Sequence, residues 1–385
     1  MMSKGDFNAN PLGIYIHIPF CIRKCNYCDF CSFPDSNGGL MSAYVDELIR
    51  RIKAFSAEYG VLSVDTIYFG GGTPTLMPAE HFKSIFNALR DGFNILENAE
   101  ISVECNPASI DEAGLAELYS LGVNRLSIGL QSANDNELRL LGRLHTFDDF
   151  CKTFNSARKV GFDNISVDLM YGIPEQSLES FNDTLLKLVS LSPEHISAYG
   201  LKIEEGTDFH RNISRLALPD EDTEAELYML CCEELLKHGY SRYEISNFAI
   251  EGRESRHNLK YWLLDDYIGF GVAAHSRFRG ERFGNSRDIK AFISGEDITC
   301  ERQKISSGAY LTELVMLGLR LESGIDKRKF IELAKTEFKQ AYPMVDSFIR
   351  AGFMVESEDR IAFTTKGFLV SNTILAQMLV FDYDE

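Results

Sequence analysis

Apolar and polar stretches alternate regularly along the first half of the chain. From residue 13 to about residue 205, six short apolar runs typical of strands are separated by amphipathic stretches typical of helices. Because βα repeats build parallel sheets with right-handed crossovers, this pattern predicts an α/β fold whose sheet curls into a barrel or part of one. The expected strands are Gly13–Pro19, Val64–Gly71, Ile101–Asn106, Arg125–Leu130, Ile165–Met170 and Ile196–Ile203. The expected helices are Met41–Tyr59, Ala79–Phe93, Glu112–Leu121, Phe150–Val160 and Leu178–Leu191.

The second half of the chain has a different pattern. Residues 206–300 form an extension with a helix at Thr223–His238, a strand at Ser241–Phe248 and an aromatic-rich stretch from His257 to Phe283. After about residue 309, helical runs precede a hairpin and a final helix, which is the order of a winged-helix-type module. The expected domains are therefore 1–205, 206–305 and 306–385. The elements of the module are Leu311–Leu321, Lys327–Lys335, Phe338–Ala351, the hairpin Phe353–Thr364 with its turn at Ser357–Arg360, and Lys366–Leu379.

Composition restricts the classes of partner and the compartment. The chain has 385 residues and a net charge of −18, which argues against a nucleic-acid partner or an anionic membrane surface. The sequence contains no run of 18 apolar residues, so no transmembrane helix is expected. The first ten residues lack the apolar segment of a secretory signal. Nine cysteines in such a chain indicate a reducing cytoplasm, and their clustering indicates a metal site rather than disulfides.

Three cysteines directly follow the first expected strand. Cys21, Cys25 and Cys28 have CxxxCxxC spacing. Three thiolates on a short loop can hold three irons of a cubane cluster and leave the fourth iron open to an exchangeable ligand. Structural zinc with Cys31 as fourth ligand is the alternative, although zinc usually takes paired CxxC units. The position after a strand, with a glycine triplet after the next strand, favours the cluster.

This motif, with Tyr27 before its last cysteine, resembles that of the radical-SAM superfamily, whose members cleave S-adenosylmethionine (SAM) reductively to a 5′-deoxyadenosyl radical. The stretch from Tyr15 to Cys21, YIHIPFC, is similar to the branch that contains oxygen-independent coproporphyrinogen III oxidase and the HemW haem chaperones. The resemblance implies a radical-SAM partial (β/α)6 barrel, an α/β extension and a C-terminal winged-helix-like module. It also implies a 4Fe–4S cluster on Cys21, Cys25 and Cys28.

Polar and glycine residues at the strand ends suggest a SAM pocket. Glycines at residues 70–72 allow close backbone approach to a ligand, and the segment resembles the one that binds the SAM amino group in the family. An acid can take the ribose hydroxyls and an arginine the carboxylate. A salt bridge or a helix cap is the alternative for each residue alone. By resemblance, the SAM contacts are Gly71, Gly72, Thr73, Glu104, Gln131, Arg143 and Asp168, with Tyr15 beside the cluster.

The choice between oxidase and chaperone depends on features outside this pocket. Only twenty residues precede Cys21, whereas the oxidase has a longer N-terminal arm. Phe30 stands where the oxidase has a fourth cysteine, and Cys31 stands where HemW proteins commonly have asparagine. This departure leaves Cys31 without an assigned role, either as a spare thiol or as a transient ligand.

The stretch from His257 to Trp262, HNLKYW, matches the HNxxYW motif associated with haem binding in HemW proteins. A neutral imidazole is a good axial ligand of haem iron, and Tyr261 and the only tryptophan offer aromatic faces to the macrocycle. The alternative is that His257 and Trp262 only cap and pack the extension. Further HemW-like stretches are 243–248 and 269–276.

The resemblance therefore favours a cytoplasmic haem chaperone, with oxygen-independent coproporphyrinogen III oxidase as the alternative. The implied cofactors are the 4Fe–4S cluster, SAM and haem as cargo. The implied partners are an electron donor to the cluster and haem-accepting proteins such as respiratory-chain subunits, which would bring peripheral contact with a membrane-bound acceptor. From Tyr310 to Glu385, nine Lys and Arg face twelve Asp and Glu, so the C-terminal module lacks the basic surface of a nucleic-acid binder.

Overall fold

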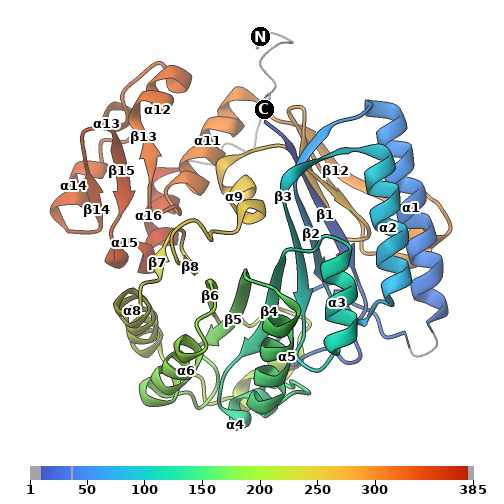
Figure 1. Cartoon of the computed structure of the whole chain (residues 1–385). Helices are drawn as coiled ribbons and strands as arrows, with labels where there is room; N and C mark the ends of the chain where they lie inside the picture. The colour runs from blue at the N-terminus through green and yellow to red at the C-terminus, as the bar shows by residue number, and fades with distance from the viewer. Residues whose placement is uncertain (1–9, 36–37, 380–385) are drawn as a thin grey trace.

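Six parallel strands form the centre of a twelve-stranded sheet (Figure 1). The structure is a computed structural model that describes residues 10–35 and 38–379, so the outer ends of the first and last expected domains lie outside it. The predicted α/β class is confirmed, and the strands follow one another in chain order with parallel neighbours. They are β1 (Leu12–Ile18), β2 (Ser63–Gly71), β3 (Asn94–Cys105), β4 (Arg125–Gln131), β5 (Ile165–Tyr171) and β6 (His195–Gly200).

Alternation along these strands separates an apolar outer face from a polar inner face. Successive side chains of a strand point to opposite sides, so every second residue shares an environment. The outward residues, such as Ile16, Phe69 and Val167, are fully buried in the main hydrophobic core. The inward residues are polar and surround a cavity in the barrel; they include Tyr68, Glu104, Arg125, Ser127, Ser166, Asp168, Ser197 and Tyr199.

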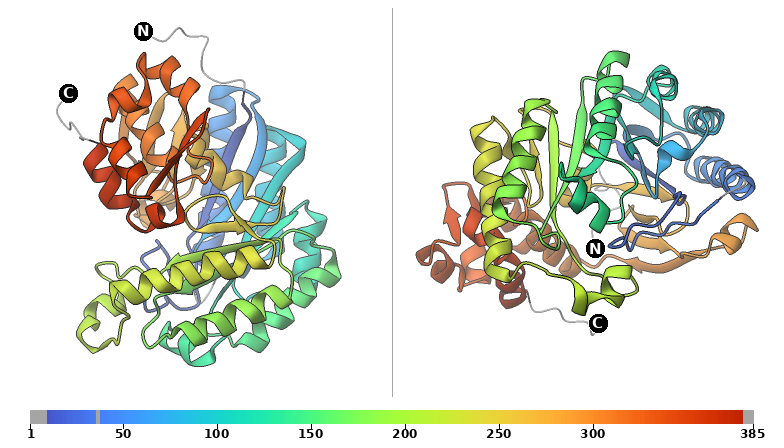
Figure 2. Two further views of the ribbon diagram at one scale, coloured as in Figure 1. Left: turned by 90° about the vertical axis from the view of Figure 1, so that its left-hand side faces the viewer. Right: turned by 90° about the horizontal axis from the view of Figure 1, so that it is seen from below.

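Helices cover the outer face of the curved sheet, as the view from below shows (Figure 2). Helix α5 starts three residues before the expected position because Thr146 and Asp149 form a capping box. A short helix that the pattern did not predict, α4, follows β4. The helices of this part are α1 (Gly39–Tyr59), η1 (Pro74–Leu76), α2 (Ala79–Gly92), α3 (Glu112–Ser120), α4 (Asp135–Leu140), α5 (Phe147–Val160) and α6 (Leu178–Ser190).

The extension adds strands to both edges of the central sheet. Strand β9 pairs in parallel with β1, and β10 to β12 continue the sheet on that side. On the other side, β8 pairs with β6, and the single strand expected at Ser241–Phe248 is instead two short strands separated by a turn. The elements are α7 (Asp208–Arg211), η2 (Ile213–Arg215), α8 (Glu221–Lys237), β7 (Ser241–Arg242), β8 (Asn247–Ala249), α9 (Arg256–Leu263), β9 (Tyr267–Phe270), β10 (His275–Phe278), β11 (Glu281–Asn285), α10 (Ile289–Ile293) and β12 (Thr299–Lys304).

The C-terminal segment forms a three-stranded sheet and helices around a hydrophobic core of their own. One long helix was expected over Phe338–Ala351, but Pro343 lacks an amide hydrogen and divides it into α13 and α14. Helix α11 packs against α9, and its Glu313 pairs with Arg277 of β10 at 2.9 Å. The elements are α11 (Ser307–Gly318), β13 (Ile325–Asp326), α12 (Lys327–Ala334), α13 (Phe338–Ala341), α14 (Val345–Arg350), β14 (Met354–Glu356), β15 (Arg360–Phe363), α15 (Thr365–Leu369) and α16 (Ser371–Met378).

Within the part of the chain that the structure describes, none of the helices combines the length and the apolar character that a bilayer crossing needs.

Candidate functional site

A cavity of about 410 Å³ extends through the barrel from the carboxyl ends of the parallel strands. Its walls contain the predicted cluster cysteines together with the residues predicted to bind SAM. Because parallel strands present their carboxyl ends at one edge, residues far apart in the sequence meet there. The predicted residues that line this cavity are Cys21, Cys25, Cys28, Gly71, Gly72, Thr73, Glu104, Gln131, Arg143 and Asp168.

Backbone hydrogen bonds hold the cysteine segment in place at both of its ends. The amide of Cys21 donates to the carbonyl of Phe33, and the amide of Phe33 donates to the carbonyl of Pro19. Inside the loop, the amide of Cys28 donates to the carbonyl of Cys25 at 3.2 Å. The sulfur of Cys21 lies 3.5 Å from the hydroxyl of Thr73. The loop and the segment after β2 therefore form one wall of the cavity.

The three cysteines of the motif line the cavity, whereas Cys31 does not. The described residues contain no set of three or more His, Cys, Asp or Glu side chains arranged around one metal position. A cubane places each thiolate on a different iron, so its sulfurs stay further apart than the ligands of one ion. Cys31 is buried and does not line the cavity, and its sulfur points to the carbonyl of Arg287 at 4.0 Å. The structure therefore separates Cys31 from the three cysteines of the motif.

Glycines let the segment after β2 pack directly on the cysteine segment. At Gly71, whose φ is +115°, an added Cβ would lie 2.6 Å from the ring of His17. At Gly72, it would lie 2.6 Å from the carbonyl oxygen of Phe20. Both distances are shorter than carbon contacts allow. The sequence predicted that these glycines allow a ligand to approach the backbone; in the structure they also let the segment after β2 pack on β1 and on Phe20 at the mouth of the cavity.

Two carboxyl groups lie inside the barrel. Glu104 accepts hydrogen bonds from the hydroxyl of Tyr68 at 3.0 Å and from the amide of Gly71 at 3.1 Å. Burial, with the nearby Asp168 adding repulsion, raises the pKa of Glu104 to about 7. Asp168 accepts from the hydroxyl of Ser127 at 3.1 Å, and burial raises its pKa as well. Both groups can accept further hydrogen bonds from ligand hydroxyls.

Arg143 connects the segment after α4 to the cysteine loop. Its Nη2 donates to the side-chain oxygen of Asn106 and to the carbonyl of Gly129, both at 2.7 Å. Its Nη1 lies 3.7 Å from the sulfur of Cys25. A cation in this place can pair with a carboxylate of a ligand in the cavity.

Gln131 ends β4 in a left-handed conformation, with φ of +72°. This region is unfavourable for residues other than glycine and costs on the order of 1–3 kcal/mol. A shift in the pairing of β4 with β5 accompanies it between Gly129 and Gln131. The backbone therefore turns at the point where the side chain of Gln131 reaches the cavity.

Tyr15, His257 and Trp262 lie outside this cavity. The hydroxyl of Tyr15 donates to Nδ1 of His17 at 3.0 Å, so Tyr15 reaches the cysteine segment through His17. His257 is 0% exposed, and its ring nitrogens lie 2.9 and 2.8 Å from the hydroxyl oxygens of Thr66 and Tyr261. Burial lowers the pKa of His257 to about 3. The imidazole is thus neutral, and both of its nitrogens are already engaged.

Trp262 lines a second cavity, of about 580 Å³, between α9, the segment before β8 and α11. Aromatic side chains and the thioether of Met316 form its apolar walls, and its charged lining combines three arginines with Glu244 and Glu313. Glu313 pairs with two of these arginines, Arg277 and Arg282. Tyr199 and Asn258 line both this cavity and the one in the barrel. The two cavities are therefore neighbours, separated by these two side chains. Residues that characterise the second cavity are Tyr261, Trp262, Tyr267, Arg277, Met316 and Arg320.

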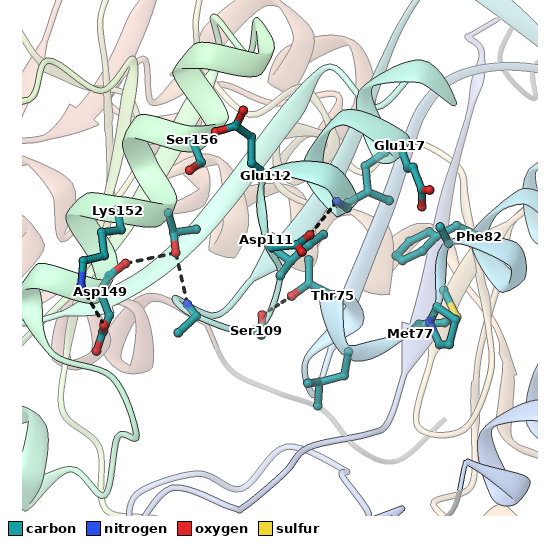
Figure 3. A pocket seen from close by; sticks show the side chains of 18 residues that line it. Thr75, Met77, Phe82, Ser109, Asp111, Glu112, Glu117, Asp149, Lys152 and Ser156 are labelled. Atoms are coloured by element: carbon teal, nitrogen blue, oxygen red, sulfur yellow. Dashed lines mark hydrogen bonds and ion pairs between the residues drawn. The ribbon is translucent and has the colours of Figure 1, made fainter.

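A third cavity, of about 690 Å³, lies among α2, α3 and α5 (Figure 3). It contains none of the residues predicted to be functional. Its polar groups are used in local structure: Asp111 caps α3, and Asp149 caps α5 and pairs with Lys152. Thr75 and Ser109 bond to each other at 2.6 Å. This arrangement gives no indication of a catalytic site.

Several residues of the barrel cavity were not predicted from the sequence. Tyr68, Asn106, Arg125, Ser127 and Tyr199 line it but belong to none of the motifs. Alternation could have found Ser127, which stands four residues before the predicted site residue Gln131 on the same strand and thus on the same face. Tyr199 lies on β6, which holds no predicted site residue, so no such signal pointed to it.

Comparison with known proteins agrees with this geometry. Residues 15–188 match the family model described as the radical SAM superfamily, and residues 305–370 match the HemN C-terminal domain. "Heme chaperone HemW" of Bacillus subtilis is 34% identical over 380 residues, covering 95% of this chain and 98% of that protein. The protein of the same description from Escherichia coli is 32% identical over 374 residues, covering 96% and 98%.

Among solved structures, the coproporphyrinogen III oxidase HemN from Escherichia coli, described as a radical SAM enzyme, superimposes with a TM-score of 0.83. The match covers 96% of this chain and 90% of that one at 23% identity. At this level of identity the likeness shows a common fold, which extends from the barrel to the C-terminal segment.

Proposed function

The chain belongs to the radical SAM superfamily and, within it, to the family of HemW heme chaperones, and we propose that it binds a 4Fe–4S cluster, SAM and haem and delivers the haem to acceptor proteins. The observation that carries the proposal is the barrel cavity, where the three cysteines face the polar strand ends of the sheet. The full-length similarity to proteins named heme chaperone supports the haem part.

In this proposal Cys21, Cys25 and Cys28 hold three irons, and SAM chelates the fourth. Such a bound pair supplies one-electron cleavage chemistry at the sulfonium of SAM, with electrons from an external donor. The chain orients the ligand: Arg143 holds the carboxylate, and the carboxyl groups of Glu104 and Asp168 accept from hydroxyls. Their place in the interior of the barrel keeps bulk water away from these contacts.

The haem is proposed to lie in the cavity beside Trp262. Its volume and its aromatic lining suit part of a flat macrocycle, and Arg320, which bonds to Asn372 rather than to a carboxylate, suits a carboxylate of a tetrapyrrole. The position next to the SAM cavity, across Tyr199 and Asn258, keeps haem and SAM close. His257 would serve as an axial ligand only after its bonds to Thr66 and Tyr261 open.

The proposed partners are an electron donor and haem-accepting proteins such as respiratory-chain subunits, reached from the cytoplasm by peripheral contact with the membrane. Nucleic acid is not among them, because the chain carries a net charge of −18. The alternative function is that of oxygen-independent coproporphyrinogen III oxidase. The likeness to HemN supports the common barrel but does not extend to its substrate.

One experiment separates the two functions. The protein is reconstituted with iron and sulfide without oxygen, and haem binding and haem transfer to an apo-cytochrome are measured. Decarboxylation of coproporphyrinogen III is measured in parallel with SAM, a low-potential reductant and an electron acceptor supplied. The chaperone function predicts haem binding and transfer without decarboxylation. Turnover of coproporphyrinogen, or no haem binding in the reconstituted protein, would contradict it.

A further inference from the structure

Arg125 is a buried cation without a partner. It is the first residue of β4 and one of the largest fully buried side chains, with 2% of its surface exposed. Its Nε has no hydrogen-bond partner, and within residues 10–35 and 38–379 its guanidinium takes part in no hydrogen bond or ion pair. An unpaired buried charge is costly, since the lost hydration is not replaced. In the folded chain this unpaired charge lies in the wall of the barrel cavity, which Arg125 lines.

Glu100 and Asp168, on the strands that flank β4, accept their hydrogen bonds from groups other than Arg125, although the charge of Arg125 favours the ionised form of Asp168 and so acts to lower its pKa. Glu100 accepts from the backbone amides of Arg256 and His257, at 3.0 and 3.1 Å. Asp168 accepts from the hydroxyl of Ser127. The positive charge of Arg125 acts on its surroundings nonetheless, because it helps to keep the pKa of His257 low. The guanidinium therefore has five donors available, in a geometry that suits an oxyanion.

The missing anion is not the carboxylate of SAM. Arg125 stands six residues before Gln131 on the same strand, and at roughly 3.3 Å per residue this places their backbones about 20 Å apart. The cysteines and Arg143 lie at the Gln131 end, where the sulfur of Cys25 is 3.7 Å from Arg143. A ligand that chelates the cluster iron has its carboxylate at that end. Arg125 belongs to the opposite, inner part of the cavity.

The inner part of the cavity adjoins the Trp262 cavity. Asn258 and Tyr199 line both spaces, and Asn258 lies in α9 one residue after His257, which packs against β2. A flat molecule beside Trp262 that carries a flexible acidic arm can extend the arm past Asn258 toward Arg125. Haem and its metal-free parent carry two such arms, the propionates.

We propose that Arg125 binds a propionate carboxylate of the tetrapyrrole that lies in the Trp262 cavity. This inference rests on the proposed haem function and adds to it the group that recognises the cargo. The carboxylate would give Arg125 the charge-assisted, bidentate partner that the ligand-free chain lacks. The site thereby selects free tetrapyrrole acids over their neutral esters.

The test uses cluster-reconstituted protein with protoporphyrin IX and its dimethyl ester as probes. Neither probe contains iron, so axial ligation does not contribute. Binding is followed by quenching of Trp262, the only tryptophan of the chain. The wild type should prefer the diacid by roughly tenfold or more, as a charge-assisted contact implies. Arg125→Gln should lose this preference by weakening the diacid alone.

Two further variants complete the test. Arg158→Gln removes an arginine that pairs with Glu194 outside both cavities, and it should keep the wild-type preference. Arg125→Lys retains the charge without the two-pronged geometry, so it should keep part of the preference even if Arg125→Gln fails to fold. Three results would overturn the inference: equal binding of both probes by the wild type, a preference for the diacid that survives in Arg125→Gln, or an undiminished preference in Arg125→Lys. None of these results would contradict the proposed binding of haem. A wild type that binds neither the two probes nor haem contradicts the proposed function itself.

Discussion

The ring of His17 donates a hydrogen bond from Nε2 to the carbonyl oxygen of Cys31, at 3.0 Å. This bond fastens the end of the cysteine segment to β1, from which the segment emerges. Tyr15 completes the arrangement by donating to the other ring nitrogen. Burial lowers the pKa of His17 to about 4, so the ring is neutral and can donate with one nitrogen while it accepts with the other.

The stability of the protein should therefore depend on pH through His17. In the unfolded chain His17 is protonated below its ordinary pKa of 6.5, whereas in the folded chain it stays neutral until the pH reaches about 4. Stability should thus fall as the pH falls through this window. Urea unfolding at several pH values checks this, with His17→Gln as the comparison. A variant with the same slope as the wild type would show that His17 does not contribute.

Cluster assembly should distinguish Cys31 from the other cysteines of the segment. Replacing Cys21, Cys25 or Cys28 by alanine should abolish the visible iron–sulfur absorption and SAM binding, because each supplies one iron ligand. Cys31→Ala should retain both, since its sulfur points away from the cavity. Iron and sulfide analysis after reconstitution is the measurement. If Cys31→Ala loses the cluster as completely as the others, the assignment of three ligands is wrong.

Arg143 should contribute strongly to SAM affinity. Removing a charge-assisted contact to the ligand carboxylate should cost about 2–4 kcal/mol, or roughly 30- to 1000-fold in the dissociation constant. Equilibrium binding of SAM to cluster-loaded Arg143→Ala measures the effect. Arg139→Ala is the matched control, because Arg139 is exposed on the neighbouring helix α4. Equal SAM affinity in both variants would remove Arg143 from the site.

SAM affinity should also rise with pH through the titration of Glu104. The pKa of this carboxyl is about 7 in the ligand-free protein, and only its ionised form offers both oxygens to the ribose hydroxyls. Binding should therefore strengthen as the pH increases from 6 toward 8, with release of a proton. Calorimetry in buffers of different ionisation enthalpy measures that proton. Glu104→Gln should bind more weakly and with little dependence on pH between these values.

His257 and Trp262 should differ in what they contribute. His257→Ala leaves the buried hydroxyls of Thr66 and Tyr261 without partners, which should lower the free energy of unfolding by about 2–4 kcal/mol. Trp262→Ala removes part of a cavity wall, so it should weaken haem binding with a smaller loss of stability. Haem titration and chemical unfolding of both variants test this. An altered Soret band in a fully stable His257→Ala would instead place His257 on the haem iron.

The family and the α/β fold could be predicted from the sequence because their signals are local. Cys21, Cys25 and Cys28 lie within eight residues of the sequence, and the alternation of apolar and polar residues that marks a strand or a helix is contained in that element alone. The meeting of the polar strand ends in one cavity also followed, since the geometry of parallel strands requires it. Local exceptions, such as the helix divided at Pro343, depended on boundaries that periodicity marks poorly.

The environment of His257 and Arg125 was decided by tertiary structure alone. The motif around His257 suggested either a haem ligand or a residue that packs the extension, and in the structure α9 packs against the barrel and joins His257 to Thr66, 191 residues earlier in the chain. Arg125 belongs to none of the sequence motifs, and only the closed barrel shows that its buried guanidinium takes part in no hydrogen bond or ion pair with the described residues. Burial and charge pairing depend on which distant segments pack together, and the period of a single element carries no information about those contacts.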